Sequence, residues 1–271
     1  RFIKTHLARL LLIPSLLCLD APLAALGWAT SLSSDFAEQG LQSTSRANLA
    51  ALFLSVWIIY LFDRLYDVRH SQRPWKPTVR HAWARHHRGL LIMLAAAASG
   101  ILAIRLLPAL DKSTLLAGIG PGLVTLLYYL AFRFSGLHAH FSRRVPLKEL
   151  TIGICFTAGI GVAVYPGVIG VEFRILAAGL TLLFSANCLL ISRAEDQLDA
   201  SVDPAAHFAG GRAEKDFRLP ERLVSLSMIA AIPVAAGGNF VLSSSSLFVC
   251  GVMTFFLARN ERDKLRPVMQ A

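Results

Sequence analysis

The sequence predicts an all-α membrane protein: a polytopic bundle of about eight transmembrane helices. Hydrophobic residues make up 55% of the 271 residues and charged residues only 16%, with a mean hydropathy of +0.55. An ordinary soluble domain has about 45–50% apolar and about 25% charged residues. Long apolar runs also recur along the chain, without the short alternating strands that are typical of an outer-membrane barrel.

Eight apolar segments are predicted to be helices that cross the bilayer. Most approach the roughly 20 residues that a spanning helix needs, and the shorter ones gain length from amphipathic ends. They are rich in Leu, Ala and Gly and are expected to be helical, since the backbone groups of a spanning segment must be satisfied within the membrane. In chain order they lie at about 7–30, 47–62, 89–108, 114–132, 149–166, 173–192, 223–242 and 245–258.

Two features of these segments have alternative explanations. The first segment has a basic start, as a signal peptide does, but its apolar part is longer than usual and no clean cleavage motif follows Ala29. We therefore expect a first span. Glycine clusters at 118–122 and 159–161 lie inside spans, where small residues allow close packing or a kink. They are not predicted to bind phosphate, because no strand precedes them and the Lys-Ser/Thr pair of a phosphate loop is missing.

The basic residues predict the topology. Of the 27 Lys and Arg, 23 fall in the N-terminal end, in 64–88, 133–148 and 193–222, and in the tail from Arg259. The intervening loops hold only Arg46, Arg105, Lys112 and Arg174, beside the acidic Asp35, Glu38, Asp111 and Glu172. The positive-inside rule therefore places both termini and the basic loops in the cytoplasm, as in a bacterial inner (plasma) membrane. The net charge of +10 reflects this topology, so we do not expect a nucleic-acid partner.

The domain organisation is predicted to be simple. Residues 1–271 form one helical membrane domain, with two cytoplasmic loops at about 63–88 and 193–222 that cap a cavity. The four cysteines are far apart and lie inside apolar segments, so we expect small core residues rather than disulfides or a zinc site.

Two acidic clusters follow apolar segments, and both fall on the predicted cytoplasmic side. The first is Asp63-Arg64-Leu65-Tyr66-Asp67, and the second is Glu195-Asp196-Gln197-Leu198-Asp199. Carboxylates four residues apart lie on one face of a helix, where both can point at one hard cation such as Mg²⁺. The predicted metal ligands are Asp63, Asp67, Glu195, Asp196, Asp199 and Asp203.

The order of these elements resembles the UbiA superfamily of intramembrane prenyltransferases. That family carries two cytoplasmic aspartate-rich motifs, approximately N-D-x-x-D-x-x-x-D and D-x-x-x-D, after its second and sixth helices. Here Asp63 and Asp67 match the end of the first motif, whereas Ile59-Tyr60 replaces its leading Asn-Asp and Glu195 replaces the first Asp of the second. The stretches 69–74 and 143–153 also resemble the family over a match of roughly 45–205. The family usually has nine helices, so the ninth is expected to be absent.

The resemblance implies Mg²⁺-dependent transfer of a prenyl group from an allylic polyprenyl diphosphate to an aromatic or other lipophilic acceptor. It implies catalytic roles for Asp63, Asp67, Glu195 and Asp199, as the carboxylates that hold the bridging metal. Cationic side chains would neutralise the remaining diphosphate oxygens. The residues predicted to bind the diphosphate are Arg64, Arg73, Arg143 and Lys148, with Tyr60 and Tyr66. The residues predicted to form the cavity wall are Phe62, Tyr66, Tyr128 and Tyr129.

Other interpretations stay open at the level of sequence. Asp63 and Asp67 are also compatible with a solvated helix end that pairs with Arg64 and Arg69. The histidines at 81, 86 and 87 share a loop with arginines, which favours a lipid-facing basic loop over a metal cluster. The alternative functions are a catalytically degraded relative that binds or assembles partners, a transporter, and another lipid head-group transferase. The acceptor, the prenyl chain length and the oligomeric state are not predicted.

Overall fold

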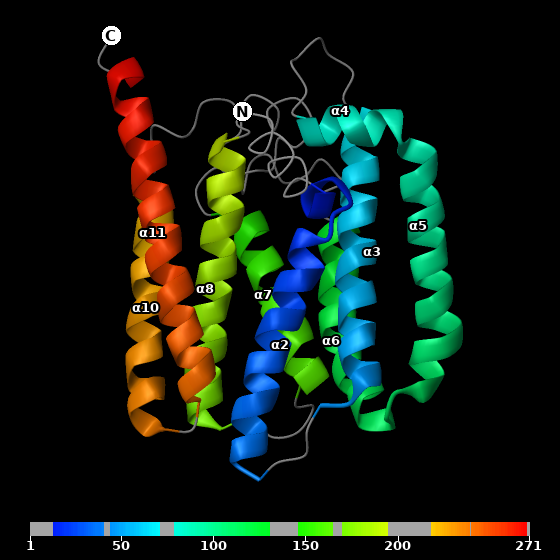
Figure 1. Cartoon of the computed structure of the whole chain (residues 1–271), viewed down its shortest axis with the longest axis horizontal. Coiled ribbons are helices and arrows are strands. Elements are labelled where there is room, and N and C mark those ends of the chain that lie inside the picture. Colours follow the sequence, from blue (N-terminus) through cyan, green and yellow to red (C-terminus); the bar gives the residue numbers. More distant parts are fainter. Residues whose placement is uncertain are drawn as a thin grey trace, which may run out of the picture.

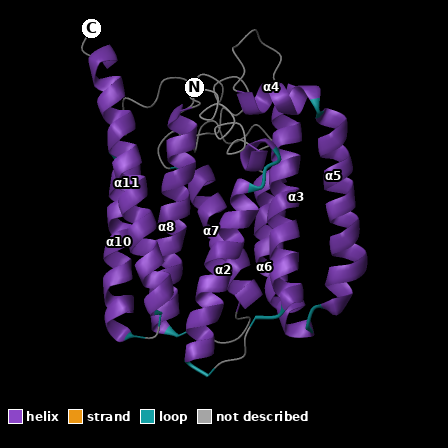
Figure 2. Ribbon diagram, in the orientation of Figure 1, coloured by secondary structure: helices purple, strands orange, loops and turns teal. Residues whose placement is uncertain are grey.

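The prediction of an all-α membrane protein is confirmed at the level of fold class. The computed structural model describes residues 13–40, 44–70, 79–130, 146–164, 170–194, 218–238 and 240–269. Over these residues every regular element is helical, and the long helices stand side by side as one bundle (Figures 1 and 2). The long apolar helices make the chain an integral membrane protein.

Nine α-helices are described, together with two short helical turns of other types. They are α2 (Asp20–Glu38), α3 (Arg46–His70), α4 (Val79–His86), α5 (Arg88–Ile101), the π turn η1 (Leu102–Leu106), the 3₁₀ turn η2 (Leu107–Ala109), α6 (Lys112–Tyr128), α7 (Leu147–Val164), α8 (Val171–Ala194), α10 (Leu219–Gly237) and α11 (Val241–Met269).

Five of the described helical stretches are long and apolar enough to cross a membrane, and one further apolar helix is shorter. The five are Arg46–Arg69, Arg88–Ala109, Leu147–Val164, Val171–Ser192 and Leu219–Gly237, and the shorter one is Val241–Leu257. The count of about eight spans therefore stays a prediction.

Several helix boundaries differ from the predicted ones. The sequence predicts the first span at about 7–30, whereas α2 runs Asp20–Glu38. The second half of α2 therefore includes a polar stretch that lies outside the predicted span. α3 continues through Asp63 and Asp67 to His70, and α4 occupies Val79–His86, so much of the predicted cap loop 63–88 is helical. In the second predicted cap loop, α8 ends at Ala194 and α10 begins at Leu219, and residues 195–217 lie outside the described part of the chain.

The ends of the helices fall at two opposite ends of the bundle. α3, α8 and α11 end at the same end of the bundle, the upper one in Figure 1, where α4 also lies across it. The acidic pair of α3 and the C-terminus of α8 therefore share one end. The helices that begin near Arg46, Lys112 and Arg174 start at the opposite end.

Helix packing divides the bundle into a dense half and an open half. α8 packs along α7 and α10, and α10 along α11, around buried side chains such as Leu176, Leu180 and Leu247. By contrast, α5 packs mainly on α3 and α6 mainly on α7. The apolar cavity described below lies in this more open half, along α3, α6 and α7.

Asp35 connects α2 to the start of α11 through two hydrogen bonds. The sequence placed this residue in an exposed acidic loop, but its side chain is only 1% exposed. Its carboxylate accepts hydrogen bonds from the backbone N–H groups of Leu242 (3.0 Å) and Ser243 (2.9 Å). These belong to the first turn of α11, so Asp35 serves as that helix's N-terminal cap from a distant part of the chain.

We expect Asp35→Ala to lower the free energy of unfolding by about 1–3 kcal/mol, because two buried N–H donors lose a charged acceptor. Asp35→Asn keeps one acceptor oxygen, so its free energy of unfolding is expected to lie between those of Asp35→Ala and the wild type. Thermal unfolding in detergent measures the effect, with Glu38→Ala as control, since Glu38 is exposed in the same last turn of α2. Equal melting temperatures for the Ala variants at 35 and 38 would show that the cap contributes nothing.

Candidate functional site

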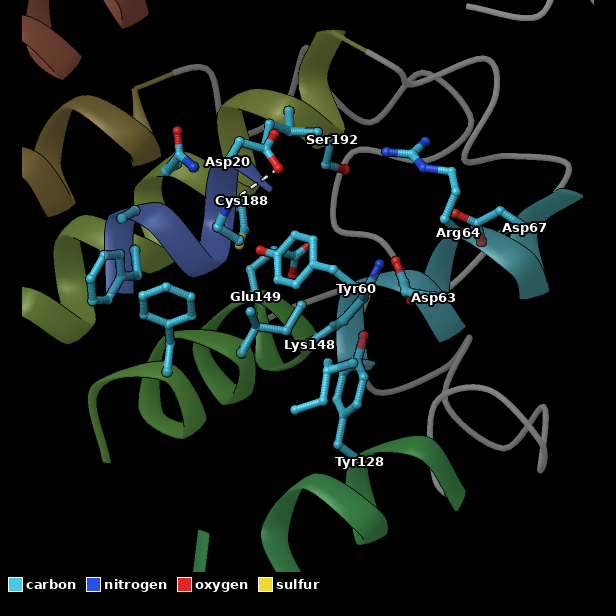
Figure 3. Close-up of a pocket in the computed structure, with 18 of the residues that line it drawn as sticks. Asp20, Tyr60, Asp63, Arg64, Asp67, Tyr128, Lys148, Glu149, Cys188 and Ser192 are labelled. Carbon is cyan, nitrogen blue, oxygen red and sulfur yellow. Dashed lines mark hydrogen bonds between the residues drawn. The ribbon is translucent and has the colours of Figure 1, made fainter. Parts of the chain in front are cut away.

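A polar cavity of about 390 Å³ opens at the end of the bundle where α3 and α8 end. Its wall combines residues from α2, α3, α4, α6, α7, α8 and α11, so it is formed by tertiary packing rather than by one segment. Figure 3 shows the charged side chains reaching into it from α3 and α7. The lining includes Asp20, Tyr60, Asp63, Arg64, Asp67, Arg80, His81, Tyr128, Tyr129, Lys148, Glu149, Asn187, Cys188 and Ser192.

One face of α3 supplies the first acidic cluster to this cavity. Tyr60, Asp63, Arg64 and Asp67 all line it. They are spaced three and four residues apart, which brings them onto one helical face. The predicted pairing of Asp63 and Asp67 on one face of a helix is therefore confirmed as geometry.

Two aromatic residues predicted for the cavity on this helix do not line either cavity among the described residues. Phe62 is 53% exposed, and neither Phe62 nor Tyr66 lines the polar cavity or the apolar cavity below it. Both lie two residues after a residue that faces the cavity. Each residue of a helix turns the side-chain direction by about 100°, so both side chains point away from the cavity. The predicted wall residues Tyr128 and Tyr129 do line the cavity. The hydroxyl of Tyr129 donates a hydrogen bond to the carbonyl of Ile59 at 3.0 Å, which joins α3 to the end of α6.

His81 is a cavity residue that the sequence had assigned to a lipid-facing loop. Its side chain is only 4% exposed, and its Nε2 lies 2.9 Å from Nη1 of Arg64. Burial, followed by the positive charges of Arg64 and Arg80, lowers the pKa of His81 to about 3. The imidazole is therefore neutral at physiological pH, and Nε2 accepts the hydrogen bond that the guanidinium of Arg64 donates.

The N-terminus of α7 and the last turns of α8 complete the polar wall. The predicted Lys148 lines the cavity, and so does its neighbour Glu149, which is only 2% exposed. From α8, Cys188 and Ser192 lie one turn apart on the cavity face. The Oγ of Ser192 is buried and has no hydrogen-bond partner among the described residues. A buried hydroxyl in this state is costly unless a ligand satisfies it.

Several predicted site residues lie outside the described part of the chain. These are Arg73, Arg143, Glu195, Asp196, Asp199 and Asp203. Within the described residues, no three His, Cys, Asp or Glu side chains form a group that could hold a metal ion. Asp63 and Asp67 provide hard oxygen ligands of the kind that Mg²⁺ prefers, and further ligands would have to come from outside the described residues. Glu195 directly follows Ala194, the last residue of α8, whose preceding turn lines the cavity.

A second cavity of about 490 Å³ lies along α3, α6 and α7, beside η1 and η2. Its wall is almost entirely apolar, with side chains such as Leu52, Val56 and Leu115. The two cavities share five lining residues: Ile59, Tyr60, Tyr128, Ile152 and Phe156. A polar chamber at the end of the bundle is thus continuous at its wall with an apolar chamber between the helices.

The sequence analysis missed several polar lining residues, among them Asp20, His81, Glu149 and Ser192. Glu149 carried a usable signal, since a carboxylate beside Lys148 at the start of a spanning helix is unusual. The others carried none. Asp20 reaches the cavity because α2 begins there, and Ser192 reaches it because α8 turns that face inward.

Comparison with protein-family models, with curated proteins and with solved structures gave no match for this chain.

Proposed function

We propose that this chain is a UbiA-like prenyltransferase that moves a prenyl group from an allylic polyprenyl diphosphate to an aromatic or other lipophilic acceptor. The observation that carries this proposal is a pair of adjacent cavities that share five lining residues. One holds Arg64 and Lys148 beside Asp63 and Asp67, and the other is apolar and lies among the long apolar helices. An amphiphile with a strongly anionic head and a hydrocarbon tail matches both chambers at once.

The head of such a substrate would lie among charges of both signs. A diphosphate cannot approach two carboxylates directly, so Asp63 and Asp67 favour a head group that arrives with Mg²⁺. The metal would supply charge neutralisation for the departing diphosphate. Arg64 and Lys148 would bind diphosphate oxygens directly, and Tyr60, at the junction of the cavities, would lie where the head meets the tail.

The residues present are consistent with the electron flow of prenyl transfer. The C–O bond to the diphosphate breaks with its electron pair leaving on the diphosphate, and the acceptor then forms a bond to the allylic carbon and loses a proton. Tyr60, Tyr128 and Phe156 surround the junction with aromatic rings, whose faces stabilise an allylic cation. Glu149 lines the same chamber and is the candidate acceptor for the proton.

The direct test is turnover. Purified protein in lipid is incubated with Mg²⁺ and labelled prenyl diphosphates of about C10 to C20, a range chosen to vary the length of the apolar tail, and diphosphate release is measured with a panel of aromatic acceptors. We expect release that requires both Mg²⁺ and an acceptor. Intact prenyl diphosphate at saturating Mg²⁺ with every acceptor, and identical behaviour of Asp199→Asn, would overturn the enzyme proposal.

The second candidate function is a catalytically degraded relative that binds lipophilic partners. It is favoured by Ile59-Tyr60, which stands where the related motif has Asn-Asp and so removes an expected ligand. Both Ile59 and Tyr60 line the cavity, so the substitution falls in the site itself. This candidate predicts saturable binding of the prenyl diphosphate without cleavage. The transporter alternative has no specific observation in its favour.

Ser192→Ala separates a ligand contact from a structural role. The hydroxyl is buried and has no partner among the described residues, so its removal is expected to leave the melting temperature unchanged or raise it. If Ser192 hydrogen-bonds the substrate head, the same change should weaken prenyl diphosphate binding by about tenfold, the effect of one lost hydrogen bond of about 1.4 kcal/mol. The control is Ser225→Ala, because Ser225 Oγ already donates to the carbonyl of Glu221. Unchanged affinity in Ser192→Ala would remove this residue from the site.

The proposed orientation places the polar cavity on the cytoplasmic side. We expect a topology reporter fused after Ala271, or inserted near His81, to read cytoplasmic, and one near Glu38 to read from the opposite side. α4 lies at the cavity end of the bundle, where α3, α8 and α11 also end (Figure 1). This arrangement supports one common side of the membrane for all four. An external signal near His81 would contradict the orientation and the supply of a cytoplasmic diphosphate.

A further inference from the structure

We propose that His81 is a positioning residue for Arg64, holding its guanidinium toward an incoming diphosphate without neutralising its charge. This inference rests on the proposed function, because it names the residue that prepares Arg64 for the anionic head group. His81 lies outside every motif that carried the family resemblance, and the sequence alone favoured a lipid-facing loop for it.

The geometry of the contact is specific. Arg64 Nη1 lies 2.9 Å from His81 Nε2, both residues line the polar cavity, and the imidazole is almost fully buried. The two residues come from different helices, α3 and α4. A guanidinium has five N–H donors, and this contact fixes its plane while using only one of them. The other donors serve neighbouring groups, among them Cys18, and ligand oxygens.

The position of His81 is set by the packing of α4 on α3. α4 packs on α3 through a small buried cluster that includes Leu61, Ala84 and Leu91. Ala84 is fully buried, three residues after His81, so the same face of α4 points toward α3. The packing of α4 on α3 therefore holds His81 on the side of α4 that faces Arg64.

The charge of the acceptor is the second part of the argument. Arg64 lies between Asp63 and Asp67 on α3, and a long cationic side chain on such a helix has carboxylates within reach. Asp67 and Asp63 already act on the charge of Arg64, and a further carboxylate would offset more of it, whereas a neutral imidazole holds the guanidinium without adding negative charge. The low pKa of His81, about 3, agrees with this role because it keeps the imidazole neutral.

Three substitutions at position 81 separate geometry from charge. His81→Gln keeps a neutral acceptor, His81→Glu offers an acceptor with a negative charge, and His81→Leu offers none. The probe is inorganic pyrophosphate, titrated with and without Mg²⁺ into the full-length protein in detergent by calorimetry. His86→Leu, an exposed change in the same helix, is the control.

We expect His81→Gln to bind pyrophosphate within about threefold of the wild type, and His81→Leu about tenfold more weakly, as for one lost oriented contact. His81→Glu should bind at least about tenfold more weakly although it folds, because it adds a further negative charge beside Arg64, where the anion would bind. A purely structural role predicts instead that affinity follows melting temperature in all three variants. Should His81→Leu fail to fold, the comparison of the Gln and Glu variants still decides the matter.

Equal pyrophosphate affinity for the Gln and Glu variants would overturn the proposal, and so would a wild-type protein that does not bind pyrophosphate. If pyrophosphate binds and the series behaves as expected, but no prenyl diphosphate is cleaved, then the proposed prenyl transfer fails and the positioning role stands. The two proposals are thus separated by different measurements on the same protein.

Discussion

Asp67→Ala is expected to abolish Mg²⁺-dependent binding of prenyl diphosphate, with a loss of at least about 100-fold, the upper range seen when groups that merely orient metal ligands are removed. Asp63 and Asp67 are the two carboxylates that α3 presents to the polar cavity. One remaining carboxylate on this helix cannot hold a bridging ion against its own hydration, because Mg²⁺ sheds water reluctantly. Titration of a labelled prenyl diphosphate into protein in nanodiscs, at several Mg²⁺ concentrations, measures the effect.

The matched control for this experiment is Asp111→Ala. Asp111 is exposed, precedes α6 at the opposite end of the bundle and lines neither cavity. Asp111→Ala removes the same charge as Asp67→Ala, so both variants share any general electrostatic effect on anion binding. If Asp67→Ala binds the diphosphate as the control does, Asp67 belongs to a solvated helix end rather than to a metal site. Asp199→Asn then tests the second acidic cluster in the same assay.

Gly153→Ala is expected to destabilise the bundle by about 1–3 kcal/mol, the usual range for overpacking a tightly packed interface. A Cβ at this position would lie 2.6 Å from the backbone carbonyl oxygen of Thr181 and would also collide with Oγ of Ser185. Both neighbours belong to α8, so α7 and α8 would have to separate. Thermal unfolding in detergent reports the loss.

The same substitution should also weaken the site. α7 carries Lys148 and Glu149, and α8 carries Cys188 and Ser192, so separation of the two helices widens the polar cavity. The control is Gly120→Ala in α6, where an added Cβ meets no atom within 4 Å. Wild-type stability and wild-type pyrophosphate affinity in Gly153→Ala would mean that the α7–α8 contact tolerates a methyl group and does not set the cavity's width.

Local sequence patterns predicted the features that depend on neighbours along the chain. Hydropathy determined the helical membrane class, since burial in a bilayer demands long apolar runs with satisfied backbone groups. The four-residue spacing of Asp63 and Asp67 determined that they share a face of α3, because helix geometry is local. The segment boundaries were less predictable. α2 includes the polar stretch before Glu38 because tertiary contacts, including those of Asp35, stabilise it there.

What only the tertiary structure decided is which polar groups meet. Nothing local distinguishes His81 from the exposed His86 on the same helix, yet packing of α4 on α3 buries the first against Arg64. Phe62 and Tyr66 seemed as suitable for the cavity wall as Tyr60, and only the rotation of α3 within the bundle excludes them. By itself, the sequence determined a helical membrane protein with an acidic pair on one helix. The adjacent polar and apolar cavities depend on contacts between distant segments, whose energies no local pattern encodes.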